Sequence, residues 1–192
     1  MHNNISSELY ENEKRRFTSN KLADQLSSRS NALTRTVRYY AVTGNPAYLE
    51  TYEKLRASHR GIMPQLTNVV TTDDTETKDV DATKDTVELG NGGRVTHAEY
   101  SILQEGQRLA EALIVIEDKA IALLEAGEAA EAVQLLHNEA YSSSSARLQR
   151  TFDSFYFAVE KDTNHVSEEL TSKKTQLFRN YGFLLFIPTF PR

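Results

Sequence analysis

The chain has 192 residues, a length typical of a single domain. Its 27 acidic residues outnumber 22 basic residues, and the net charge of −5 argues against a nucleic-acid partner, because nucleic-acid binders usually carry a basic face. Cysteine is absent, which excludes disulfides, thiolate nucleophiles and cysteine-ligated metals.

The first long segment, residues 1–43, contains no glycine or proline, and neither does the last, residues 128–181. Both are much longer than a β-strand, so they predict two very long helices. Gly44-Asn45-Pro46 predicts the turn into a second, shorter helix, which Gly61 and Pro64 should end or kink. Gly127 predicts a tight turn between the third and fourth helices.

Apolar residues recur at three- and four-residue intervals in each long segment, as in an amphipathic helix. The predicted buried seams are Leu22, Leu26, Leu33, Val37 and Tyr40 in the first helix, Leu103, Leu109, Leu113, Ile116, Ala120 and Leu123 in the third, and Leu136, Ala140, Leu148, Phe155, Val159, Val166 and Leu170 in the fourth.

The segment 71–95 is polar and acidic and has few large apolar residues, so we expect a flexible loop between the second and third helices. The third helix should begin after Thr96. Thr96 and Glu99 have the spacing of a capping box, in which each side chain binds the other residue's backbone N–H.

These elements predict an all-α fold: an elongated, antiparallel, up-down-up-down four-helix bundle with long first and fourth helices. The two long helices should extend past the short pair toward one end. We expect residues 1–180 to form this bundle. Residues 181–192 would be the start of a truncated membrane helix or an apolar tail, because the apolar run 181–190 is too short for a bilayer core of about 30 Å. The amino-terminal residues show no signal-peptide pattern.

The stretch LADQLSSRSNALTRTVRYYAVTGNPAYLETYEKL, residues 22–55, carries the steps Leu33-Thr34-Arg35, Arg38-Tyr39-Tyr40 and Val42-Thr43-Gly44-Asn45. It resembles the extracytoplasmic four-helix-bundle sensor domain of bacterial transmembrane receptors, among them methyl-accepting chemotaxis proteins, sensor histidine kinases and diguanylate cyclases. Residues 131–155 are similar to the entry of that domain's fourth helix. This chain departs from the family pattern at Ser30-Asn31, where two aspartates are common, and at His59-Arg60-Gly61.

The resemblance implies a ligand-sensing domain in the periplasm, anchored in the bacterial inner membrane by flanking helices and acting as a homodimer. The predicted function is chemoreceptor-like sensing by helix displacement. A histidine-kinase or diguanylate-cyclase sensor is one alternative, and a non-sensing helical interaction bundle is another. Lys173, Lys174 and Arg179 favour the last, because basic residues are typical of the cytoplasmic flank of a membrane helix.

A ligand site is expected near the turns. Arginines suit carboxylate or phosphate, and tyrosines offer flat apolar walls with a polar tip, so we expect a small anionic or aromatic metabolite. The alternative is that the tyrosines belong to the core and the arginines to surface ion pairs. The candidate ligand-binding residues are Thr34, Arg35, Arg38, Tyr39, Tyr48, Tyr52, His137 and Tyr141.

No enzyme, metal or cofactor chemistry is expected. The five histidines never stand three or four residues apart, so no helical metal-binding pair exists. The glycines at 90, 92 and 93 lack the Lys and Ser or Thr that a phosphate-binding loop requires.

Overall fold

The computed structural model describes residues 2–67, 86–89 and 93–184. Within these ranges the chain is mostly helical, as predicted, with one small sheet that was not predicted. The elements are α1 (His2–Thr43), α2 (Pro46–Thr67), β1 (Thr86–Glu88), β2 (Arg94–Thr96), α3 (His97–Glu125), α4 (Ala129–His137) and α5 (Glu139–Leu184).

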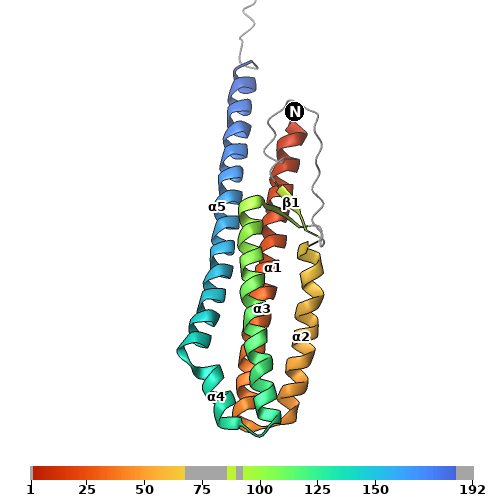
Figure 1. Ribbon diagram of the computed structural model, residues 1–192. Helices are drawn as coiled ribbons and strands as arrows, with labels where there is room; N and C mark the ends of the chain where they lie inside the picture. Colours follow the sequence, from red (N-terminus) through yellow and green to blue (C-terminus); the bar gives the residue numbers. More distant parts are fainter. Residues whose placement is uncertain (1, 68–85, 90–92, 185–192) are drawn as a thin grey trace, which may run out of the picture.

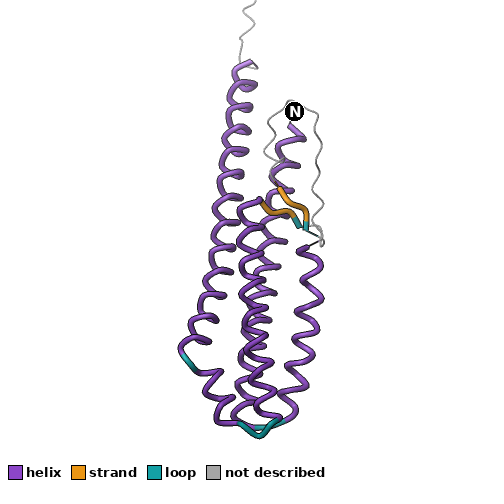
Figure 2. The backbone as a smooth tube through the Cα atoms, viewed as in Figure 1, coloured by secondary structure: helices purple, strands orange, loops and turns teal. Residues whose placement is uncertain are grey.

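The helices lie lengthwise beside one another in an elongated molecule, and the chain reverses direction from α1 to α2, from α2 to α3 and from α3 to α4 (Figure 1). The helix α1 packs mainly against α5 and α2, and α3 packs mainly against α5 and α4. One end of the molecule carries the turns from α1 to α2 and from α3 to α4, and we call it the turn end. At the other, the terminal end, α1 begins and α5 finishes, and both extend past α2 and α3 (Figures 1 and 2).

The turns follow the predicted positions. Gly44 and Gly127 have φ angles of 63° and 85°, in the left-handed region that favours glycine. Asn45 accepts a hydrogen bond from the Ala47 backbone N–H at 3.0 Å, which caps the start of α2. The turn end is therefore fixed by local backbone chemistry.

The capping box at the start of α3 is confirmed. The Thr96 hydroxyl accepts from the Glu99 N–H at 3.2 Å, and the Glu99 carboxylate accepts from the Thr96 N–H at 2.7 Å.

Two predicted helix boundaries are wrong. The helix α2 does not end at Gly61 or Pro64 but continues to Thr67. Pro64 cannot donate a hydrogen bond to the carbonyl four residues earlier, but it lies in the last turn, so this loss falls at the end of the helix.

The predicted fourth helix is in fact two helices, α4 and α5, separated at Asn138, which has an extended backbone with ψ of 164°. Its side chain accepts from the Tyr141 N–H at 2.7 Å and so caps α5. Figure 1 shows the resulting bend between α4 and α5.

A flexible loop over residues 71–95 is also wrong where the structure describes that segment. Strands β1 and β2 pair antiparallel, with Val87 opposite Val95, and Val87, Leu89 and Val95 are buried. The Ser19 hydroxyl of α1 donates to the Arg94 carbonyl at 3.2 Å and ties the hairpin to the helices. Figure 2 shows the hairpin at the terminal side of α3. Residues 71–85 lie outside the described residues.

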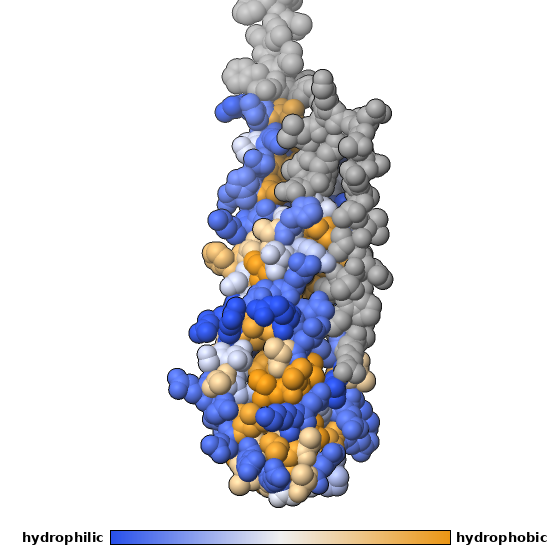
Figure 3. All heavy atoms as spheres, viewed as in Figure 1, coloured by the Kyte–Doolittle hydropathy of each residue, from blue (hydrophilic) through white to orange (hydrophobic). Residues whose placement is uncertain are grey.

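Most residues of the predicted seams are buried, among them Leu26 and Val37 of α1 and Phe155 and Val159 of α5. The exceptions are Ala140, which is exposed, and four residues that are only partly buried: Tyr40, Ile116, Leu123 and Val166. Gly106 lies inside α3, close to α5: a Cβ at this position would stand 3.1 Å from a ring carbon of Phe152. Hydrophilic residues cover much of the face in Figure 3, and many of the hydrophobic residues on this face lie toward the turn end.

Among the described residues, no helix combines the length and apolar character needed to span a bilayer. The predicted membrane-helix start begins within the last residues of α5, and residues 185–192 lie outside the described residues.

Candidate functional site

A single buried carboxylate joins four helices near the turn end. Glu117 of α3 is only 1% exposed. Its Oε1 accepts from the Tyr141 hydroxyl of α5 at 2.6 Å and from the Thr34 hydroxyl of α1 at 3.2 Å. Its Oε2 accepts from the Tyr52 hydroxyl of α2 at 3.0 Å. We call Thr34, Tyr52, Glu117 and Tyr141 the Glu117 cluster.

No ion pair among the described residues includes Glu117, so three hydroxyl groups are its charge-stabilising partners. Burial is the largest influence on the pKa of Glu117 and raises it, and the negative charge of Asp118 adds to this effect. The hydrogen bonds from Tyr141, Tyr52 and Thr34 lower the pKa, but they do not outweigh burial. The pKa of Glu117 therefore lies above the usual value. Burial, followed by the charge of Glu117, also raises the pKa of both tyrosines. The tyrosines therefore stay protonated and act as donors.

Arg38 lies beside this cluster without pairing with the carboxylate. Its Nε donates to the Leu136 carbonyl at 3.1 Å, near the end of α4. Its guanidinium carbon stands 5.1 Å from the centroid of the Tyr141 ring, within cation–π range. Arg38 thus fixes α1 against α4 and the face of Tyr141.

The structure gathers only half of the residues predicted for a ligand site. Thr34, Arg38, Tyr52 and Tyr141 come together around Glu117. The other four, Arg35, Tyr39, Tyr48 and His137, lie elsewhere. Arg35 and His137 are exposed, and His137 contacts the Val133 carbonyl of its own helix at 2.9 Å. Tyr39 and Tyr48 form a surface ring pair with centroids 5.4 Å apart.

A small cavity lies between α1, α2, α3 and α5 beside Glu117. Its volume is about 10 Å³, room for about one water molecule. Two buried polar side chains on its wall are unsatisfied: neither ring nitrogen of His59 nor the hydroxyl of Ser30 has a hydrogen-bond partner among the described residues. The cavity is lined by Ser30, Leu33, Thr34, His59, Ala110, Leu113, Ile114, Glu117 and Leu148.

Burial lowers the pKa of His59, and the positive charge of Arg29 lowers it further, against an opposing effect of Glu111. A neutral His59 presents one ring nitrogen as a donor and the other as an acceptor. The cavity wall therefore offers unused hydrogen-bonding capacity.

Sequence reasoning missed Glu117 and His59, although a signal for each was present. Glu117 follows Leu113 by four residues and precedes Ala120 by three, so it occupies the buried seam of α3. His59 follows Tyr52 by seven residues on the buried side of α2. A charged or titratable residue at a seam position is unusual and indicates a buried polar interaction.

A second, partly buried polar cluster lies toward the terminal end. The Arg15 guanidinium of α1 donates to Glu99 of α3 at 2.8 Å and 2.9 Å and to Asp162 of α5 at 2.6 Å. We call these three residues the Arg15 cluster. Nearby, the Asn12 amide donates to the Thr163 carbonyl at 2.8 Å. These contacts tie α1 to α5.

Among the residues that the structure describes, no group of three or more acidic or histidine side chains is placed to hold a metal ion. No protein-family model, curated protein or solved structure matches the chain.

Proposed function

We propose that this chain is the ligand-sensing, extracytoplasmic part of a bacterial transmembrane signal-transduction receptor, chemoreceptor-like and built as an up-down-up-down four-helix bundle. One observation carries the proposal: near the turn end a single carboxylate, Glu117, binds side chains of α1, α2 and α5. From that point α1 and α5 continue together past the shorter helices (Figure 1).

Such an arrangement supports signalling by helix displacement. A ligand shifts a conformational equilibrium only by the difference in its affinity for the two states. A change in the hydrogen bonds of Glu117 alters the contacts of three neighbouring helices at once. A small slide or rotation of α5 against α1 would then reach the terminal end.

The remaining parts of the proposal come from the sequence resemblance. The domain would lie in the periplasm, be anchored in the inner membrane by flanking helices and pair with a second copy through its long helices. The output would be chemotactic, with a histidine kinase or diguanylate cyclase as the alternative outputs.

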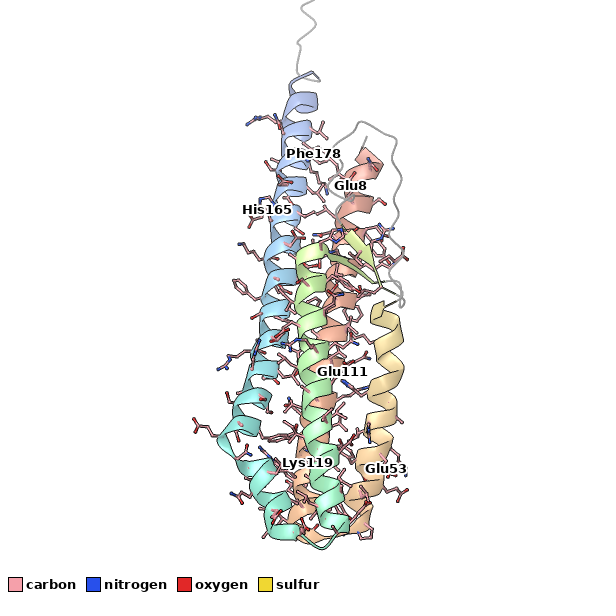
Figure 4. All side chains as sticks on the ribbon, viewed as in Figure 1. Glu8, Glu53, Glu111, Lys119, His165 and Phe178 are labelled. Atoms are coloured by element: carbon pink, nitrogen blue, oxygen red, sulfur yellow. The ribbon has the colours of Figure 1, made fainter. Side chains whose placement is uncertain are left out.

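The absence of cysteine makes the test direct, because labels attach only where a cysteine is introduced. Spin labels at Glu8→Cys and His165→Cys report on α1 and α5 toward the terminal end (Figure 4). Labels at Glu53→Cys and Lys119→Cys, which are also exposed, form the control pair near the turn end.

Amino acids, organic acids, polyamines and nucleobases are first screened for compounds that raise the Tm. A saturating binder should shift the mean distance of the terminal pair by about 1–2 Å. The control pair should shift less. A binder that leaves the terminal distance unchanged would contradict sensing by helix displacement.

A second candidate function is a non-sensing helical bundle that docks a protein partner. The observation favouring it is the size of the cavity, about 10 Å³, which leaves no room for a metabolite of several heavy atoms unless the helices move. If no compound in the screen raises the Tm, this second function is favoured over the first.

A further inference from the structure

We propose that the cavity beside Glu117 binds the ammonium ion. The inference names the ligand class for the proposed sensor, and its signalling meaning rests on that function. The binding itself stands on the geometry of the cavity alone.

The first argument is the uncompensated charge of Glu117. Buried carboxylates are normally paired with a cation, and no described cation forms an ion pair with this one. An ionised carboxylate has about four acceptor positions, and Thr34, Tyr52 and Tyr141 use three. One position remains for a charged donor.

The second argument is the pair of unsatisfied groups on the same wall. His59 is 1% exposed and Ser30 is 9% exposed, and each keeps polar atoms without a partner among the described residues. A neutral imidazole nitrogen and a hydroxyl oxygen both accept hydrogen bonds. The cavity therefore collects acceptors, and an ammonium ion is a donor on every side.

The third argument is size and lining. The cavity has a volume of about 10 Å³, which accommodates a guest of about the size of water. Ammonium is of that size, whereas a carboxylate metabolite or an aromatic ring is larger. The other lining groups are mostly aliphatic, including Leu33, Ala110 and Ile114.

The proposed ligand is a cation, whereas the sequence predicted an anionic or aromatic ligand. The predicted anionic or aromatic metabolite followed from Arg35, Arg38 and the tyrosines. Arg35 is exposed, and Arg38 is engaged with the Leu136 carbonyl and the Tyr141 ring, so a carboxylate rather than an arginine borders the cavity.

The test uses the complete 192-residue chain and inorganic salts. The Tm is measured against increasing ammonium chloride, with sodium chloride and tetramethylammonium chloride at the same ionic strength. Ammonium should raise the Tm saturably and by more than sodium does. Tetramethylammonium should not raise the Tm beyond the value in sodium chloride. In parallel, ¹⁵N-labelled ammonium is added to the unlabelled protein. The protons of the bound ammonium ion should be shielded from exchange with water and should therefore give a ¹H–¹⁵N signal.

The variant Glu117→Gln keeps the shape of the side chain and removes its charge, so it should abolish the ammonium effect and the shielded signal. The matched control is Glu125→Gln, the same change at an exposed position of α3, which should leave both intact. A second variant, Ala110→Val, fills the cavity without touching the carboxylate and should also abolish binding.

Three results would overturn the inference. The first is that the unmodified chain gives equal Tm curves for ammonium and sodium and no shielded ¹⁵N signal. The second is that the ammonium effect survives in Glu117→Gln. The third is a saturable response to a carboxylate or aromatic anion in place of ammonium. The last would leave the proposed sensor function standing. Conversely, ammonium binding without movement of the spin-labelled helices would support the site and contradict the sensor.

Discussion

Two glutamates of α3, Glu99 and Glu117, are equally buried, each 1% exposed, yet they have different surroundings. Glu99 receives two hydrogen bonds from the Arg15 guanidinium, which also binds Asp162. Glu117 receives three hydroxyl hydrogen bonds and has no ion pair with a described residue. One buried charge is compensated by an opposite charge, and the other is not.

The difference separates a structural contact from a responsive one. Burial alone would lower the pKa of Arg15, but the hydrogen bonds and charges of Asp162 and Glu99 outweigh it and raise that pKa. The arginine therefore stays charged and holds α1, α3 and α5 together. At Glu117 the energetic balance depends on hydroxyl groups, so a proton or a small cation can change it. We expect the two clusters to respond differently to mutation and to pH.

The largest effect should come from Arg15→Ala. Removing one partner of a buried ion pair leaves Glu99 uncompensated, which should lower the free energy of unfolding by about 3–5 kcal/mol. Urea denaturation measures this. The control is Arg16→Ala, whose side chain is 35% exposed and pairs with Glu13 on the surface, and which should cost less than about 1 kcal/mol. Equal losses of unfolding free energy in the two variants would mean that the Arg15 cluster contributes no more to stability than a surface ion pair.

Tyr141→Phe should have the next largest effect, because it removes the 2.6 Å hydrogen bond to Glu117 and keeps the ring. A hydrogen bond to a charged group contributes about 1.5–3 kcal/mol. Tyr39→Phe makes the same change in a half-exposed ring and should stay within about 0.5 kcal/mol of the unmodified chain. Urea denaturation near neutral pH measures both, and an unaffected Tyr141→Phe would show that Glu117 needs no donor there.

Thr34→Val should cost about 1 kcal/mol, because it replaces the hydroxyl that donates to Glu117 at 3.2 Å with a methyl group of similar size. Thr51→Val makes the same replacement on the exposed side of α2, where the hydroxyl bonds only to its own helix, and should be nearly neutral. Thermal unfolding measures the two variants side by side. A larger loss in Thr51→Val would contradict a special role for the Glu117 cluster.

The smallest effect should be a gradual pH trend. Because the folded pKa of Glu117 lies above its unfolded value, the stabilising effect of protonation is complete below the unfolded pKa of about 4.5 and is lost as the pH rises through the folded pKa. The unmodified chain should therefore lose stability relative to Glu117→Gln as the pH rises above about 4.5.

The contribution of His59 to stability changes with pH in the opposite direction. Because its folded pKa is lowered, this contribution is complete above the unfolded pKa and is lost as the pH falls through the folded pKa. Since His59 is present in both proteins, its contribution cancels in the difference. Glu125→Gln is the control, and its stability difference from the unmodified chain should not change with pH. A pH-independent difference for Glu117→Gln would mean that Glu117 has no raised pKa.

Sequence reasoning succeeded where structure is decided locally. The turns at Gly44 and Gly127, the capping box of Thr96 and the apolar seams all follow from interactions between residues a few positions apart. It failed at the hairpin, where Val87 and Leu89 alternate with polar residues but become buried only against the helices. It also failed at Asn138, whose capping of α5 competes with continuation of the helix.

At the candidate site, four predicted residues converge, because periodicity places Thr34 and Tyr52 on inward faces. The group at their centre was not predicted, since a glutamate at a seam position has no partner visible in the local sequence.

By itself the sequence determined the long helical segments, the turns at Gly44 and Gly127 and most of the buried faces, because these depend on backbone conformation and on the three- and four-residue period. Only the tertiary structure decided the role of the two seam glutamates. Glu99 meets an arginine 84 residues earlier in the chain, and Glu117 meets three hydroxyl groups from three other helices. The physical reason is that the cost of burying a charge depends on which distant groups packing brings within hydrogen-bonding distance, and no local pattern specifies them.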